Sequence, residues 1–180
     1  ATIHIDYIPF YDPKAPKKST LAAIKALHKL FVRYPNDYAG MCMELIQGEG
    51  GYNIGNTQFF KTIINILKNE SIPIFVDEVQ TFGRTSELFS AQHFEIINDV
   101  DIISIGKLSQ VCATLYRNHL TPKPGLISQT YTASTTAIES GYQIINYLIK
   151  NNHFGSKGKN IVLGNYFNSL LRKIAVKKTN

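Results

Sequence analysis

The sequence predicts an α/β fold with a mainly parallel sheet flanked by helices. Between residues 39 and 107, short apolar runs alternate with longer segments in which apolar residues recur every three or four positions. This alternation of strand and helix patterns is typical of βαβ units, whose strands lie parallel in one sheet. With 180 residues and 44% hydrophobic composition, the chain is long enough to bury one good core.

Helices are predicted where the apolar period is close to 3.6 residues. The first begins at Ser19, a residue type favoured at the helix N-cap, and ends at Pro35. A second begins at Thr57, which is also a suitable cap. The other expected helices cover residues 88–97, 134–151 and 160–176.

Strands are predicted from short apolar runs that are bounded by polar or turn residues. Residues 73–76 form such a run, and we expect them to be buried in a sheet that is covered on both faces. The other expected strands cover residues 39–46, 101–105 and 111–116.

Two of these strands end in side chains that can carry chemistry. Asp77 follows the run 73–76, and Lys107 follows the run 101–105 after one glycine. Ligands of open α/β sheets bind at the carboxyl ends of the strands, so we expect both side chains at one edge. A lysine and a carboxylate together suit an aldehyde cofactor. The amine can form a Schiff base, and the carboxylate can keep a ring nitrogen protonated.

Three blocks of sequence carry a more specific signal. They are MELIQGEGG (43–51), VDEVQTFGRTSELF (76–89) and DIISIGK (101–107). In this order and at these separations they resemble the class III aminotransferases, which are fold-type-I enzymes that use pyridoxal 5'-phosphate. The stretch GKLSQVCA (106–113) is similar to the lysine 6-aminotransferase branch, where Gln-Val-Cys follows the cofactor lysine.

The resemblance implies a role for each matching residue. Lys107 would form the Schiff base with pyridoxal phosphate and move a proton between the substrate carbon and the cofactor. Asp77 would pair with the pyridinium nitrogen, which makes the ring an electron sink. Val79 would pack on the ring face, and Gln80 would hydrogen-bond the ring hydroxyl.

Two further residues match family positions outside this block. Glu49 corresponds to a glutamate that faces the substrate pocket. Thr130 corresponds to a threonine that binds the cofactor phosphate of the neighbouring subunit, which implies a homodimer. The sequence departs from the family pattern at Leu45, where proline is usual, and between Thr81 and Phe82, where a glycine is usual.

The resemblance also implies a domain organisation. Residues 1–152 would be part of the cofactor-binding large domain, and residues 153–180 would lead toward a small domain that this sequence lacks. The glycine-rich phosphate loop and the aromatic residue that stacks on the ring would lie upstream of it. We therefore expect the sequence to be shorter than a usual family member and to be a fragment, a split-gene product or a degenerate remnant.

Charge, hydropathy and residue spacing argue against several other classes. The net charge is +6, but the basic residues are dispersed, whereas a nucleic-acid footprint is a concentrated basic stripe. No apolar run approaches the ~20 residues of a membrane span. The histidines show no metal-ligand spacing, and no GxSxG elbow occurs. Cys42 and Cys112 lie in apolar runs, which predicts buried thiols in a reducing cytoplasm.

The predicted function is transamination between an amine or ω-amino acid and a 2-oxo acid, with pyridoxal phosphate as cofactor and a homodimer as the assembly. The alternative is a non-catalytic remnant or interaction module that keeps the fold but lacks activity. A nucleotide-binding α/β domain has only the strand–helix alternation in its favour, because neither GxxxxGK[ST] nor GxGxxG is present.

Overall fold

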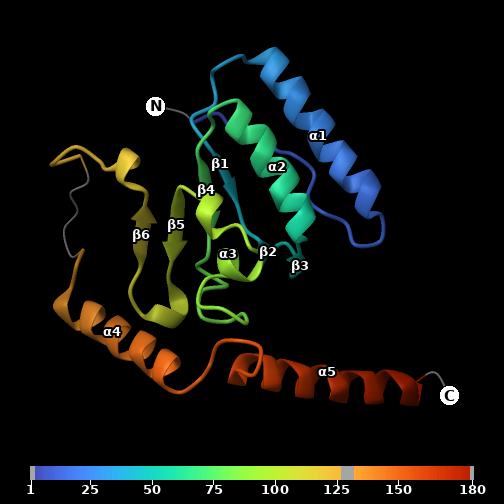
Figure 1. Cartoon of the computed structure of the whole chain (residues 1–180), viewed down its shortest axis with the longest axis vertical. Coiled ribbons are helices and arrows are strands. Elements are labelled where there is room, and N and C mark those ends of the chain that lie inside the picture. The colour runs from blue at the N-terminus through green and yellow to red at the C-terminus, as the bar shows by residue number, and fades with distance from the viewer. Residues whose placement is uncertain (1–2, 127–131, 179–180) are drawn as a thin grey trace.

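The computed structural model describes residues 3–126 and 132–178 and is built on a four-stranded sheet. Across the sheet the strands are β1 (Met41–Met43), β4 (Ile74–Asp77), β5 (Ile102–Ile105) and β6 (Ala113–Tyr116). The first three run parallel, and β6 is antiparallel to β5 (Figure 1). A separate antiparallel hairpin joins β2 (Ile46–Gln47) to β3 (Asn53–Ile54). The prediction of a mainly parallel α/β sheet is confirmed.

Five α-helices accompany the sheet in the described part of the chain. They are α1 (Pro16–Arg33), α2 (Thr57–Asn69), α3 (Ser90–His93), α4 (Thr135–Lys150) and α5 (Lys159–Lys178). Short 3₁₀ turns occur at η1 (Ile97–Asp99), η2 (Lys107–Ser109) and η3 (Asn118–Leu120).

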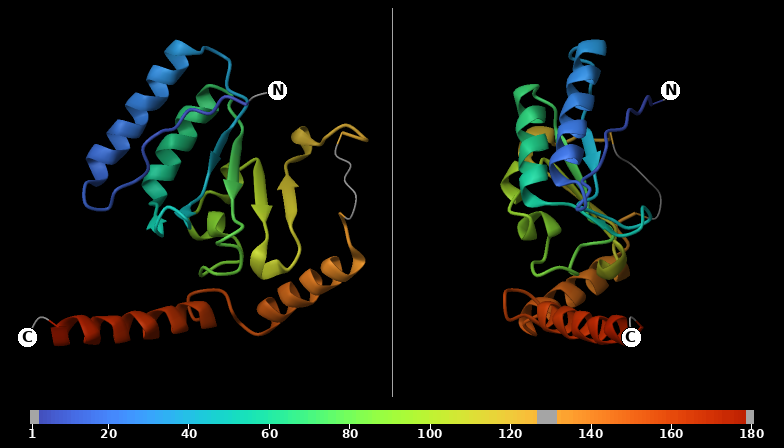
Figure 2. Two further views of the ribbon diagram at one scale, coloured as in Figure 1. Left: turned by 180° about the vertical axis from the view of Figure 1, so that it is seen from behind. Right: turned by 90° about the vertical axis from the view of Figure 1, so that its right-hand side faces the viewer.

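Helix α2 supplies the core of the domain. It buries Phe59, Phe60, Ile63, Ile64 and Leu67, which lie on one face at three- and four-residue spacing. That face packs against the buried side chains of β4 and β5, and α1 lies beside α2 (Figure 2). The hydrophobic contact between helix and sheet is therefore the main stabilising element of the fold.

Both predicted helix starts differ slightly from the observed ones. The α2 cap is Asn56 rather than Thr57, because the Asn56 side chain accepts hydrogen bonds from the backbone N–H groups of Gln58 and Phe59. Helix α1 begins at Pro16 rather than Ser19. Proline suits the first turn because its fixed φ is helical and its missing N–H would have no partner there.

Two predicted elements are shorter than expected. The strand expected over 39–46 divides into β1 and β2, because the Leu45 carbonyl accepts from Gly55 N and the chain turns away from the sheet. The helix expected over 88–97 is reduced to α3. Glu95 ends this region with a positive φ of 56°, which no α-helix can continue.

The expectation of a sheet covered on both faces is wrong for the described chain. In β4, Ile74 and Val76 are buried, whereas Phe75 and Asp77 point to the opposite face and are only partly covered. Strand β5 repeats this alternation. One face is therefore packed under α2, and the other is partly open.

The predicted burial of both cysteines is also wrong. Cys42 and Cys112 are free and exposed. Cys42 pairs in register with Phe75 on β4, so its side chain lies on the open face of the sheet. An apolar run does not distinguish the two faces of a strand when only one is covered.

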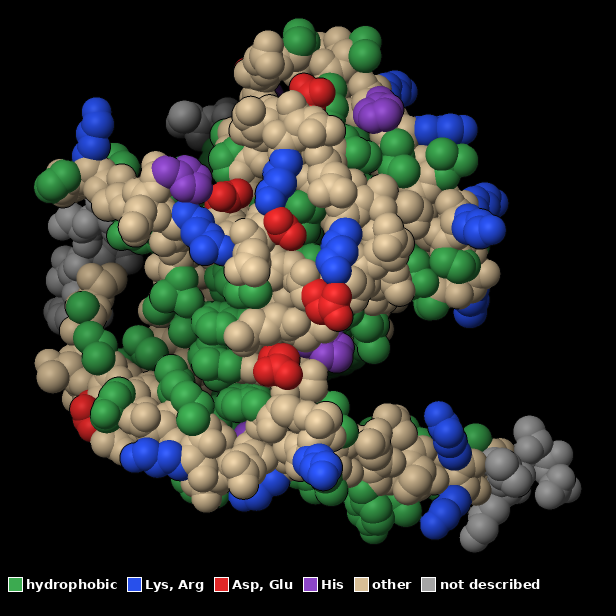
Figure 3. All heavy atoms as spheres, in the orientation of Figure 1, with side chains coloured by type: hydrophobic (Ala, Val, Ile, Leu, Met, Phe, Trp, Pro, Cys, Tyr) green, Lys and Arg blue, Asp and Glu red, His purple; other side chains and the backbone are tan. Residues whose placement is uncertain are grey.

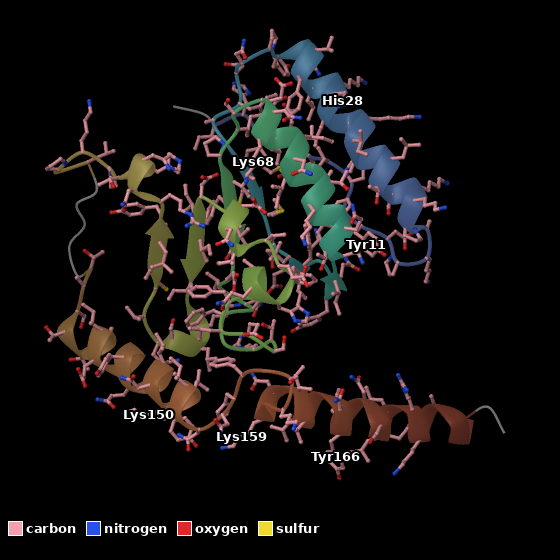
Figure 4. The ribbon with its side chains drawn as sticks, in the orientation of Figure 1. Tyr11, His28, Lys68, Lys150, Lys159 and Tyr166 are labelled. Carbon is pink, nitrogen blue, oxygen red and sulfur yellow. The ribbon has the colours of Figure 1, made fainter. Side chains whose placement is uncertain are left out.

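The last two helices extend beyond the compact part of the domain. Helix α4 lies against the turn between β5 and β6, and α5 projects sideways from it (Figure 1). Tyr166 points from α5 away from the rest of the domain (Figure 4). Among the described helices, none combines the length and apolar composition that crossing a membrane requires.

Candidate active site

Asp77 is the last residue of β4, at the carboxyl edge of the parallel strands. Its Oδ1 accepts hydrogen bonds from Val79 N and from Ser104 Oγ, both at 2.9 Å. Ser104 is also its register partner on β5. Within the described residues, no hydrogen bond is made to Oδ2 of this half-buried carboxylate. One oxygen is thus fixed by the protein, and the other is available to a ligand.

Lys107 follows β5 at the same edge of the sheet. It lies three residues after Ser104, begins the turn η2 and is exposed. Gly106 precedes it, and a Cβ at Gly106 would lie 3.4 Å from Val79 Cγ1 and from Cys112 Sγ. The Val79 side chain therefore packs against the strand end that carries Lys107. Asp77, Val79 and Lys107 all belong to the ends of two neighbouring strands.

Gln80 lies between two other parts of the chain. A Cβ at Gly48 would be 2.8 Å from Gln80 Cγ and 2.9 Å from Gln80 Nε2, so the Gly48 backbone lies directly against this side chain. On the other side, Arg84 Nη1 donates to the Gln80 carbonyl at 2.8 Å and approaches Oε1 at 3.4 Å. Gly48 is itself held by a hydrogen bond from its N–H to Glu44 Oε2.

Of the two remaining predicted site residues, the structure describes only Glu49. Glu49 is exposed in the turn between β2 and β3, next to the glycine that contacts Gln80. The contact between this loop and the edge that carries Asp77 is made by Gly48 against Gln80. Thr130 lies outside the described residues.

Glu78 is structurally important, although it is not among the predicted site residues. Its side chain is 0% exposed, and its two oxygens accept from Ser90 N at 2.7 Å and Ala91 N at 2.8 Å. Burial raises the pKa of Glu78, although the hydrogen bonds from Ala91 and Ser90 oppose this shift. The carboxyl group thereby ties the 78–90 loop, which carries Val79 and Gln80, to the first turn of α3. The sequence feature that could have indicated this role is the position of Glu78, an acidic residue directly after the buried strand β4.

The carboxyl edge also affects a neighbouring thiol. Although Cys42 is exposed as a whole residue, desolvation by neighbouring atoms raises the pKa of its sulfur, and the negative charges of Asp77 and then Glu44 raise it further. The two carboxylates thus create a negative field around β1 and β4. In the described residues, no group of three or more His, Cys, Asp or Glu side chains is arranged to hold a metal ion.

Solved structures identify the class of fold. The lysine aminotransferase of Mycobacterium tuberculosis, in its internal aldimine form, superposes on 96% of this chain and 40% of its own, with a TM-score of 0.79 and 21% identity. The ornithine aminotransferase of Toxoplasma gondii ME49 matches 71% of this chain and 31% of its own, with a TM-score of 0.63 and 27% identity. The domain has the aminotransferase fold.

Sequence comparison identifies the family. The family model described as Aminotransferase class-III matches residues 2–178, and the chain belongs to this family. The acetylornithine aminotransferase of Aquifex aeolicus (strain VF5) is 27% identical over 169 residues, which are 91% of this chain and 43% of the relative. A probable 4-aminobutyrate aminotransferase of Caenorhabditis elegans is 31% identical over 111 residues, or 61% of this chain and 23% of the relative. The chain thus spans less than half the length of these relatives.

The residues at the carboxyl edge fit the pyridoxal phosphate that this family uses. A free carboxylate oxygen on Asp77 is complementary to a ring N–H, and the apolar Val79 side chain is complementary to a ring face. The exposed Lys107 amine is accessible to an aldehyde. These are the hydrogen-bond acceptor, the contact surface and the nucleophile that such a cofactor requires.

Proposed function

We propose that this chain holds pyridoxal 5'-phosphate and contributes to transamination between an amine or ω-amino acid and a 2-oxo acid. The observation that carries the proposal is the pairing of β4 and β5, which brings Asp77 and Lys107 to one edge of the sheet. Family membership supports the same reaction class. When bound, the cofactor supplies an electron sink for a carbanion at the amino-bearing carbon.

Each residue at the edge has a proposed task. Asp77 Oδ2 would accept the ring N–H, while Oδ1 remains oriented by Val79 N and Ser104 Oγ. The fixed carboxylate favours the protonated ring nitrogen, because opposite charges at short range stabilise each other. Lys107 Nζ would hold the cofactor aldehyde covalently and then carry the proton to and from the substrate carbon.

Two side chains would set the position of the ring. Val79, packed against Gly106, would contact one ring face and exclude water from it. Gln80, held between Gly48 and Arg84, would direct its amide to the ring hydroxyl. Both roles depend on the 78–90 loop staying in place, which the Glu78 carboxyl group ensures.

The proposal also includes the identity of the amino donor. Glu49 would face the amino donor, and its place in the loop next to Gln80 supports this role. A basic ω-amino acid of the lysine or ornithine type is the proposed donor, since relatives and structural neighbours are named for lysine, ornithine and acetylornithine. Thr130 would contribute to the phosphate site of a neighbouring subunit.

A homodimer is the proposed assembly, and the exposed surface supports it. The chain exposes 12849 Å², whereas a compact 20.2 kDa monomer exposes about 8,800 Å². Obligate interfaces bury about 2,000–5,000 Å² in total, or about 1,000–2,500 Å² on each partner, so a dimer interface would cover a large part of this excess of about 4,000 Å². Exposed apolar side chains gather on α4 and α5 (Figure 3), namely Ile138, Tyr142, Tyr147, Ile149, Val162, Leu163, Tyr166, Phe167, Leu170, Leu171 and Ile174.

The division of the chain and its location are further proposals. Residues 1–152 would belong to the cofactor-binding domain, and residues 153–180 would lead to a small domain. The projection of α5 from the compact part supports this division. Two free thiols support a reducing cytoplasm as the location.

The second candidate function is a non-catalytic remnant or interaction module. The exposed apolar surface favours it, because patches of this extent are typical of protein interfaces. It predicts the same fold and the same association but no specific role for the Lys107 amine.

Cofactor titration distinguishes the two candidates. We expect pyridoxal phosphate to give a saturable change in visible absorbance that Lys107→Ala abolishes and that Asp77→Asn weakens. One matched control is Lys150→Ala, on an exposed lysine of α4 (Figure 4). The other is Asp37→Asn, on an exposed acid. Equal titration curves for Lys107→Ala and Lys150→Ala would contradict the proposed function and favour the remnant.

A further inference from the structure

The turn that carries Lys107 has an uncommon backbone. We call residues 106–111 the lysine turn. Lys107 and Gln110 both have positive φ values, 50° and 55°, although neither is glycine. Non-glycine residues rarely adopt this left-handed conformation, which is strained, so surrounding contacts must maintain it.

Hydrogen bonds inside the turn supply part of that support. The side-chain amide of Gln110 donates from Nε2 to the Lys107 carbonyl at 2.8 Å, and the Gln110 backbone N–H donates to the same oxygen at 3.1 Å. Ser109 is fully buried and donates from Oγ to the Val111 carbonyl at 2.6 Å. Gln110 thus closes the turn directly on Lys107.

Helix α4 supplies the rest of the support through Gly141. A Cβ at this buried glycine would lie 2.6 Å from Val111 Cγ1 and 3.0 Å from the Ser109 carbonyl oxygen. The second of these atoms belongs to the backbone and cannot rotate away. The absence of a side chain at Gly141 therefore allows α4 to pack directly on the lysine turn.

We propose that Gln110 and Gly141 are positioning residues for the Lys107 amine. The left-handed φ of Lys107 sets the direction of its Cα–Cβ bond relative to β5 and hence the edge of the sheet that the amine reaches. Relaxation of the turn to the common negative φ would redirect the side chain. This inference rests on the proposed function in one respect, which is that the Lys107 amine reacts with the cofactor.

Each test substitution is compared with the same substitution at a control position, which separates an effect on the position of the Lys107 amine from a general effect on packing. Gln110→Met keeps the length and charge of the side chain but removes the amide donor. Gly141→Ala adds one methyl group at the contact with α4. The matched controls are Gln58→Met, on an exposed glutamine of α2, and Gly164→Ala, on α5, where a Cβ would meet no atom within 4 Å.

One measurement reports the opening of the lysine turn, and a second reports the reactivity of the Lys107 amine. Hydrogen exchange at the residue 109 and 110 amides, measured without cofactor, reports opening of the lysine turn. Reduction with borohydride in the presence of pyridoxal phosphate, followed by peptide mapping, gives the share of label on Lys107. Cooperative thermal unfolding identifies any variant that fails to fold.

We expect Gln110→Met to increase amide exchange and to reduce the Lys107 share by about 2- to 10-fold, the equivalent of one neutral hydrogen bond. Gly141→Ala should act in the same direction, and both controls should match the wild type. Exchange and labelling unchanged from the controls in both folded variants would overturn the inference. Non-selective labelling in the wild type would instead contradict the proposed function, and amide exchange would still decide whether Gln110 and Gly141 hold the turn.

Discussion

Replacing Glu78 with alanine is expected to destabilise the domain by about 2–6 kcal/mol. The side chain is 0% exposed, and its carboxyl group accepts from Ser90 N and Ala91 N. Alanine would leave both N–H groups buried without partners, and each unsatisfied group costs about 1–3 kcal/mol. Single domains are stable by only about 5–15 kcal/mol, so this loss is large.

The assay is urea unfolding, followed by circular dichroism, of Glu78→Ala, Glu78→Gln and the exposed control Glu70→Gln. Glu78→Gln keeps the shape and one acceptor oxygen, so it should fall between the alanine variant and the wild type. The control should lie within about 0.5 kcal/mol of the wild type. A Glu78→Ala variant as stable as the control would refute the role assigned to this carboxyl group.

The pKa of Glu78 adds a second readout to the same experiment. Burial raises it in the folded state, so the folded protein binds a proton more tightly than the unfolded chain. The proton-linked part of the Glu78 contribution to stability is therefore fully present below the unfolded pKa, about 4.5, and is lost as pH rises through the folded pKa. Glu78→Gln should remove this decline, and an identical pH dependence in wild type and Glu78→Gln would contradict the assignment.

Two further substitutions test packing and association. A Cβ at Gly55 would lie 1.9 Å from Cζ of the fully buried Phe60, so Gly55→Ala should lower the free energy of unfolding in urea by about 1–3 kcal/mol or more. The control Gly164→Ala should be neutral or stabilising. Equal effects of the two substitutions would refute the close packing at Gly55. Phe167 is 60% exposed on α5, so Phe167→Glu should lower the sedimentation coefficient of an associated chain, and a wild-type chain that sediments as a monomer would contradict the proposed interface.

The parts of the fold that the sequence predicted depend on local pattern. Strands β4 and β5 are short apolar runs with Asp77 and Lys107 at their ends, and parallel pairing requires those ends to share an edge. The apolar face of α2 follows directly from its residue spacing. These features need no knowledge of distant contacts.

The features that were missed depend on contacts between distant residues. The cap of Glu78 on α3 joins positions 12 and 13 residues apart, and the contact of Gly141 with Ser109 and Val111 joins α4 to the lysine turn. Exposure of Cys42 depends on which sheet face lacks a covering helix. No periodicity or spacing in one sequence encodes such pairings.

The most direct test of the cofactor assignment is to identify the lysine that reacts with pyridoxal phosphate. The cofactor is added to the chain alone and to the chain supplemented with the segments that its longer relatives carry, then trapped with borohydride and mapped by peptide mass. We predict that Lys107 carries most of the label and that the added segments increase its share, because the family resemblance implies that they include the phosphate loop of the cofactor site. Label distributed over exposed lysines such as Lys150 and Lys123, with Lys107 no more reactive than they are, would contradict it.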